Sequence, residues 1–155
     1  MYFHRLEKTI IAVATAEGST IGVVRLSGKD AVSYAKSVTK KELFKPNKVY
    51  IANIFGKNGD VIDKSVVIYF KSPKSFTGED IVEFQTHGNG TAQTIMREIT
   101  LLGAEPAMNG EFSYRAVING KMDITEASNL CSMINASDSI SLTFARKEAF
   151  EKRFF

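Results

Sequence analysis

Short apolar runs rich in β-branched residues dominate the first two thirds of the chain. Runs of this length and composition are typical of strands buried on at least one face. They predict strands over residues 9–14, 21–27, 49–55, 61–70 and 80–86, with a shorter one over 105–108. Between the third and fourth runs, the segment Gly56-Lys57-Asn58-Gly59-Asp60 predicts a hairpin turn.

The strand predicted over 80–86 alternates between two kinds of side chain. One face receives Ile81, Glu83, Gln85 and His87, and the other receives Val82, Phe84 and Thr86. Glu83 is therefore a carboxylate within an otherwise apolar strand. Arg25 stands in the same position within the apolar run 21–27.

Helical spacing of apolar residues follows two of the predicted strands. Ser27 and Asp30 frame the start of a helix whose apolar stripe is Ala31, Tyr34, Ala35 and Val38. A second helix, ended by Gly103, has the stripe Ala92, Ile95, Met96, Ile99 and Leu102. This succession predicts an α+β fold with a mixed or antiparallel sheet and packed helices, forming one domain over residues 1–120.

The segment 110–127 joins this domain to a region that is helical throughout. Phe112, Arg115 and Ala116 keep helical spacing, and Asn119-Gly120 provides the residues best able to end a helix at positive φ. Asp123 and Glu126 have the spacing of a capping box for the next helix. Lys121 is left between two helix ends, where we expect the ligand.

Residues 121–155 are predicted to begin an all-helical domain. Ala127, Leu130, Cys131 and Ile134 fit one helix face, and Ile140, Phe144 and Ala145 fit another. The chain then ends at Phe150-Glu151-Lys152-Arg153-Phe154-Phe155. Because an uncovered apolar patch normally meets a partner surface, we interpret this region as a truncated domain.

Composition and charge narrow the class of protein. At 155 residues with 44% apolar content, the chain is long enough for one globular core. The net charge of +3 permits contact with nucleic acid without arguing for it. No Cys/His set has zinc-ligand spacing, and no Gly-Lys pair belongs to a phosphate-binding loop. No signal peptide or membrane span is visible, so a cytoplasmic protein without membrane contact is expected.

Three charged residues are candidates for binding. A buried Arg25 needs an acceptor, such as a carboxylate on a neighbouring strand, whereas an edge arginine needs none. Glu83 either faces solvent or accepts the paired N–H donors of a pterin or guanine. Lys121 either complements a helix dipole or meets an anionic tail. We interpret His87 as a structural turn histidine and Cys131 as core packing.

Four segments of the chain indicate its function more specifically than its composition does. They are residues 9–15, 22–28, 75–88 (SFTGEDIVEFQTHG) and 110–127. In this order and spacing they resemble the N-terminal region of the tRNA modification GTPases of the MnmE (TrmE) family. The resemblance implies a folate-binding domain like that of aminomethyltransferases, which forms a homodimer.

The resemblance also implies a site and a ligand. Arg25, Glu83 and Lys121 match the positions of the family's folate contacts, and the ligand is 5-formyltetrahydrofolate or a related reduced folate bound near the dimer interface. No catalytic residue and no metal ligand is implied within this chain. Potassium and magnesium belong to the GTPase domain, which lies outside these 155 residues.

The family's full-length protein acts with the flavoprotein MnmG (GidA). Together they form the 5-(carboxymethyl)aminomethyl group on wobble uridine 34 of certain tRNAs. The resemblance implies that folate supplies the one-carbon unit and that GTP hydrolysis drives conformational change. The fragment is therefore expected to bind folate and dimerise, but to be inactive as a hydrolase alone.

Two other hypotheses stay open. The chain is a stand-alone folate-dependent enzyme of the aminomethyltransferase type, which needs a catalytic acid or base of its own. Alternatively, it is an assembly module that contacts tRNA or a partner protein without folate. Lys40, Lys41, Lys45 and Lys48 form a small basic cluster that suits such a module, although a solvated loop is the commoner reading.

Overall fold

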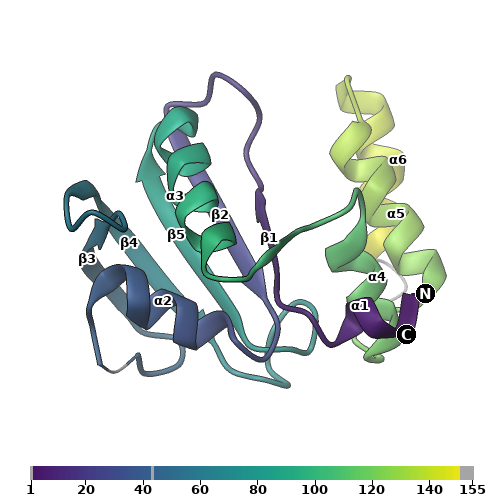
Figure 1. The fold of residues 1–155 in the computed structure, drawn as a ribbon. Helices are drawn as coiled ribbons and strands as arrows, with labels where there is room; N and C mark the ends of the chain where they lie inside the picture. The colour runs from purple at the N-terminus through teal and green to yellow at the C-terminus, as the bar shows by residue number, and fades with distance from the viewer. Residues whose placement is uncertain (1, 43, 151–155) are drawn as a thin grey trace.

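The computed structural model describes residues 2–42 and 44–150. Its strands are β1 (Ile10–Val13), β2 (Ile21–Ser27), β3 (Val49–Phe55), β4 (Val61–Phe70), β5 (Ile81–His87) and β6 (Glu105–Pro106). Its helices are α1 (Tyr2–Leu6), α2 (Ala31–Thr39), α3 (Asn89–Leu101), α4 (Glu111–Ile118), α5 (Ile124–Asn135) and α6 (Ser139–Phe150). The strands form one sheet in the order β3-β4-β5-β2-β1-β6 (Figure 1).

The sheet is mixed, which confirms the predicted α+β class. In this sheet β1 and β6 are parallel, and the other neighbouring strands are antiparallel. The strands predicted over 21–27, 49–55 and 61–70 have the observed bounds because turn-forming residues flank them. The strand predicted over 105–108 is only two residues long.

One face of the sheet is covered by α2 and α3. The alternation predicted for β5 is confirmed, since Val82 and Phe84 are fully buried in the core beside Val24 and Leu26 of β2. The predicted helix stripes supply the other side of this core through Ala31, Ala35, Val38, Ala92, Ile95 and Ile99. Leu102 is the exception, because α3 ends at Leu101 and leaves Leu102 exposed.

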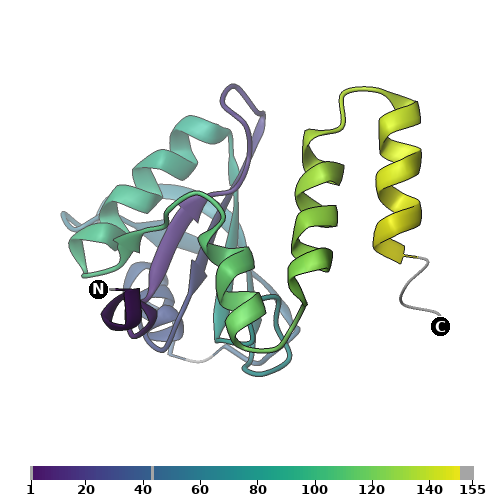
Figure 2. The same cartoon turned by 90° about the vertical axis from the view of Figure 1, so that its right-hand side faces the viewer.

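The opposite face of the sheet, which we call the open face, carries Arg25 and Glu83. Strand register places Val49, Ile68, Glu83 and Arg25 side by side in one cross-strand row. The adjacent row consists of Ile51, Val66, Gln85 and Val23. Figure 2 shows α3 on one side of the sheet and α5 and α6 on the other. Ile21, Val49 and Ile51 are exposed on the open face.

The start of α2 differs from the prediction. Asp30 occupies the N-cap position but makes no side-chain cap, and Ser27 belongs to β2. The Ser27 hydroxyl instead contacts Thr77 Oγ1 at 2.7 Å and donates to Glu79 Oε2 at 2.6 Å. Ser27 therefore anchors the loop between β4 and β5 rather than the helix.

The joint after the sheet forms as predicted. Gly120 has a φ of 69°, which ends α4 in the left-handed region. Asp123 and Glu126 form a capping box in which each side chain accepts from the other's backbone N–H, at 2.7 and 2.8 Å. The joint therefore sets the direction in which α5 leaves the domain.

The helices beyond the joint expose apolar side chains. Cys131 is exposed, so its prediction as core packing is wrong within the described chain. It lines a cavity of about 850 Å³ between α4 and α5, together with Val117, Ile118, Leu130 and Ile134. The side chains of Phe144 and Ala145, and residues 151–155, lie outside the described residues.

The boundary between residues 1–120 and 121–155 stays a prediction. Across residues 2–42 and 44–150, no helix is long and apolar enough to cross a lipid bilayer.

Candidate functional site

Arg25 and Glu83 form an ion pair on the open face. They are register partners on the antiparallel strands β2 and β5. Arg25 Nε and Nη2 both lie 2.7 Å from Glu83 Oε1. Of the two alternatives left open for Arg25, the structure has the one in which a neighbouring strand supplies a carboxylate partner.

The pair is only partly shielded from solvent. The side chain of Arg25 is 28% exposed and that of Glu83 is 16% exposed. Both arginine nitrogens contact the same carboxylate oxygen, and no described residue donates to Glu83 Oε2. Glu83 therefore retains an oxygen that can accept from a ligand.

Two phenylalanines flank the guanidinium group. The ring centroids of Phe76 and Phe112 lie 5.4 and 5.6 Å from Arg25 Cζ. These distances are within the range of cation–π attraction. Phe76 comes from the loop 71–80 and Phe112 from α4, so three separate segments meet at Arg25. Neither ring was predicted as part of the site, because tertiary packing and not a local pattern brings them to Arg25.

Lys121 reaches the same loop from the joint after α4. A Cβ atom placed on Gly78 would lie 3.1 Å from Lys121 Cγ and 3.3 Å from Lys121 Cδ. Asn119 Nδ2 also donates to Thr77 O at 2.7 Å. The structure thus brings Lys121 against the loop that carries Phe76, and Lys121 forms no hydrogen bond or ion pair with Arg25 or Glu83.

Hydrogen bonds to Asp80 hold the loop 71–80 against β4. Asp80 Oδ1 accepts from Tyr69 Oη at 3.0 Å and from Ser72 N at 2.9 Å. Burial, followed by the hydrogen bond and charge of Asp80, raises the pKa of Tyr69 to about 12. These contacts fix the loop that positions Phe76 and Gly78 relative to the open face.

A second arginine, Arg115 of α4, is fully buried. Its Nη1 donates to Lys8 O at 2.9 Å and to both carboxylate oxygens of Glu79 at 3.0 and 3.1 Å. Its Nη2 donates to Arg5 O at 2.9 Å and to Glu111 Oε1 at 3.2 Å. This network joins α1, α4 and the loop 71–80 beneath the candidate site.

The sequence predicts a helical position for Arg115 but no role for it. The available signal was a charged side chain on the same stripe as Phe112 and Ala116, with Glu111 four residues before it. Arg115 Nε is buried without a partner among the described atoms. The network is otherwise saturated, which favours a structural role for Arg115.

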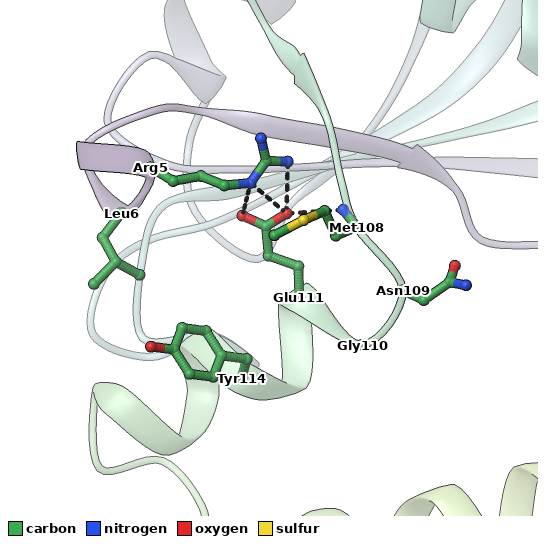
Figure 3. Close-up of a pocket in the computed structure, with 7 residues that line it drawn as sticks. All are labelled: Arg5, Leu6, Met108, Asn109, Gly110, Glu111 and Tyr114. Atoms are coloured by element: carbon green, nitrogen blue, oxygen red, sulfur yellow. Dashed lines mark hydrogen bonds and ion pairs between the residues drawn. The ribbon is translucent and has the colours of Figure 1, made fainter. Parts of the chain in front are cut away.

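A cavity of about 250 Å³ lies beside this network (Figure 3). It is lined by Arg5, Leu6, Met108, Asn109, Gly110, Glu111 and Tyr114. Its two charged side chains are already joined, because Arg5 Nε donates to both Glu111 oxygens at 3.0 and 3.1 Å. The cavity therefore has no free charge with which to orient a ligand.

Glu111 remains charged although it is buried. Desolvation raises its pKa, but hydrogen bonds from Arg5, Met108 N and Arg115 together outweigh desolvation. The net effect is a pKa below the ordinary value of 4.5. The carboxylate therefore stabilises the fold as an anion at neutral pH.

His87 lies at the end of β5 and pairs with Asp63. Its Nδ1 lies 2.8 Å from Asp63 Oδ1, and Ser65 Oγ donates to Asp63 Oδ2 at 2.7 Å. Desolvation raises the pKa of Asp63, whereas hydrogen bonds from Ser65 and His87 lower it by more. Ser65 contacts the aspartate rather than the histidine, so this group is not a Ser/His/Asp nucleophile.

The side chains at the site are suited to binding a ligand. Arg25, Glu83 and the two rings present a cation, a carboxylate oxygen and two aromatic rings around one point. Such a set suits a planar heterocycle with N–H donors. Within the described chain, no group of three or more His, Cys, Asp or Glu residues is placed to bind a metal ion.

Comparison with known proteins identifies the family to which the chain is similar. Residues 9–121 match the family described as GTP-binding protein TrmE N-terminus. The chain is 44% identical over 138 residues to the tRNA modification GTPase MnmE of Campylobacter concisus, covering 88% of this chain and 31% of that protein. It is 46% identical over 141 residues to the MnmE of Francisella philomiragia, covering 90% of this chain and 31% of that protein. The chain thus spans about a third of the length of these relatives.

Proposed function

The chain belongs to the family of TrmE N-terminal domains, and from this premise we propose that it binds a reduced folate for a tRNA-modifying GTPase. Its curated relatives are named tRNA modification GTPases. In the proposed assembly the chain forms a homodimer and acts with the flavoprotein MnmG on wobble uridine 34 of tRNA. GTP hydrolysis, with its magnesium and potassium ions, belongs to a part of the protein outside these 155 residues.

The observation that supports folate binding is the incomplete Arg25–Glu83 pair between two phenylalanine rings. Glu83 Oε2 is available to accept from the ring N–H or the exocyclic amine of a pterin. Phe76 and Phe112 supply apolar surface beside the planar ring. Lys121, whose side chain lies against Gly78 of the same loop, supplies a cation for an anionic group of the ligand. The bound 5-formyltetrahydrofolate supplies a one-carbon unit.

Calorimetric titration with 5-formyltetrahydrofolate tests this site. Glu83→Gln removes the charge and replaces one acceptor by a donor. Hydrogen bonds to a charged group contribute about 1.5–3 kcal/mol each, so affinity is expected to fall about ten- to a hundredfold. Glu17→Gln, which removes an exposed carboxylate elsewhere, serves as the control. Equal affinities for Glu83→Gln and the unchanged chain would exclude Glu83 from the site.

The open face supports the proposed homodimer. Exposed Val49 lies in the same cross-strand row as the Arg25–Glu83 pair, and exposed Ile51 lies in the adjacent row. Contiguous apolar side chains of this kind on a surface mark contact sites. A second copy packed here would bring the interface next to the proposed folate site.

Light scattering tests the interface with a matched pair of variants. Ile51 on the open face and Leu101 on α3 are both 69% exposed. Ile51→Lys is expected to give monomers, because a lysine would lose hydration at the interface. Leu101→Lys is expected to leave the dimer intact. Dissociation by both variants, or by neither, would place the interface elsewhere.

A further inference from the structure

The loop between α2 and β3 contains four lysines, Lys40, Lys41, Lys45 and Lys48, which we call the lysine loop. Lys40, Lys45 and Lys48 are exposed, and Lys41 is half-buried. Within the described part of the chain, none of these ammonium groups forms an ion pair with a carboxylate. The lysine loop therefore presents positive charge that the fold does not neutralise.

Aromatic rings contact three of these four ammonium groups. Lys41 Nζ and Lys48 Nζ lie 4.9 and 5.6 Å from the ring centroid of Tyr50. Lys40 Nζ lies 4.0 Å from the ring centroid of Phe55. Lys45 N donates to Tyr50 Oη at 2.9 Å. A cation–π contact orients a cation but leaves its charge available to an anion.

An aromatic pair joins the loop to an outer strand of the sheet. Phe44 is buried and packs edge-on against Tyr50, with ring centroids 5.2 Å apart and planes at 87°. Tyr50 and Phe55 belong to β3, the outermost strand of the sheet (Figure 1). The lysines are thus arranged along a sheet edge, and β4 separates that edge from Glu83 on β5.

We propose that the lysine loop binds the sugar-phosphate backbone of RNA. The inference rests on the proposed role in tRNA modification. Unpaired ammonium groups suit phosphates, which release counterions when lysines neutralise them. Lys41 and Lys48 share one ring, so their separation cannot exceed the sum of the two ring distances. Both ammonium groups can therefore contact neighbouring phosphates of one RNA strand.

The surroundings disfavour a lipid surface as the partner. Membrane-binding segments combine basic residues with exposed apolar side chains that enter the bilayer. Phe44, the large apolar side chain described within the loop, is instead buried against the core. The ring of Phe44 is therefore not available to enter a bilayer.

The test measures binding of unfractionated tRNA to the full chain across about 50 to 200 mM salt. The double variant Lys41→Gln and Lys48→Gln removes two ammonium groups. The slope of log affinity against log salt is expected to become shallower by about 1.4 to 1.8. Lys29→Gln with Arg97→Gln removes two exposed charges elsewhere and is expected to preserve the slope. Lys41→Arg with Lys48→Arg is expected to bind as the unchanged chain does.

Two results would overturn the proposal. One is an unchanged salt slope in the double glutamine variant. The other is binding to phosphatidylserine vesicles or polyglutamate with no binding to tRNA, which would assign the loop to a membrane or an acidic protein. Folate titration of the double variant separates the two proposals, because its folate affinity is expected to be unchanged. Failure of the chain to bind folate would refute the folate site and leave the salt slope to decide the lysine loop.

Discussion

Replacing Arg115 by methionine tests whether the buried arginine is structural. The substitution keeps a long side chain in the core but removes five hydrogen bonds, three of them to Glu79 and Glu111. Removing one partner of a buried ion pair costs about 3–5 kcal/mol. The loss lies towards the lower end of that range because Glu111 keeps Arg5 as a partner and because the unpaired Arg115 Nε is also removed.

The assay is equilibrium unfolding in urea, with thermal unfolding as a second measurement. A loss of about 3 kcal/mol is expected to lower the midpoint temperature by about 6–12 °C in a chain of this length. Arg25→Met is the matched comparison, because Arg25 also pairs with a glutamate but is 28% exposed. Arg25→Met is expected to lower the free energy of unfolding by about 1 kcal/mol or less.

The two substitutions are expected to affect ligand binding in the opposite order to their effects on stability. Arg25→Met is expected to weaken binding of 5-formyltetrahydrofolate strongly, whereas Arg115→Met, measured where it is folded, is expected to bind nearly as the unchanged chain does. If Arg115→Met unfolds at the same urea concentration as the unchanged chain, the buried network contributes little to stability. The structural assignment of Arg115 would then be wrong.

Two further predictions concern stability. The lowered pKa of Glu111 means that its stabilising effect is complete above its ordinary pKa of 4.5 and is lost as pH falls through the lowered value. Urea unfolding at a series of acidic pH values should therefore show a smaller pH dependence for Glu111→Gln; equal dependence would remove Glu111 as the source. Gly22→Ala is expected to cost about 1–3 kcal/mol, since its Cβ would lie 2.6 Å from Ala92 Cβ. Gly90→Ala in α3, with no atom within 4 Å, is expected to stabilise by about 0.5–1 kcal/mol, and similar melting temperatures for the two variants would contradict this packing.

The sheet was largely predictable because its signals are local. The hairpin between β3 and β4 follows from residues 56–60, and alternation in β5 separates the core face from the open face. The helix α1 was missed because it has five residues and depends on distant partners. Arg5 holds it by contacts to Glu105, Pro106 O and Glu111, all about a hundred positions away.

The candidate site was predictable only in part. Arg25 and Glu83 were recognised as charged residues in apolar strands, but their pairing depends on register, which no single strand encodes. Phe76 and Phe112 were missed because a loop and a helix bring them to Arg25 through tertiary packing. The pattern of a strand predicts its faces, whereas it does not predict which other segments will cover them.

The two arginine–glutamate groups differ in their burial and in how many of their carboxylate oxygens accept hydrogen bonds. This difference distinguishes a structural ion pair from one that can bind a ligand. Around Arg115, both oxygens of Glu79 and of Glu111 accept hydrogen bonds, and the guanidinium is inaccessible. Around Arg25, one glutamate oxygen takes both arginine contacts and the other has no donor among the described residues. A partly buried acceptor left unfilled costs free energy unless water or a ligand supplies the donor. The unsaturated pair, rather than the stronger buried one, is therefore where a ligand gains most by binding.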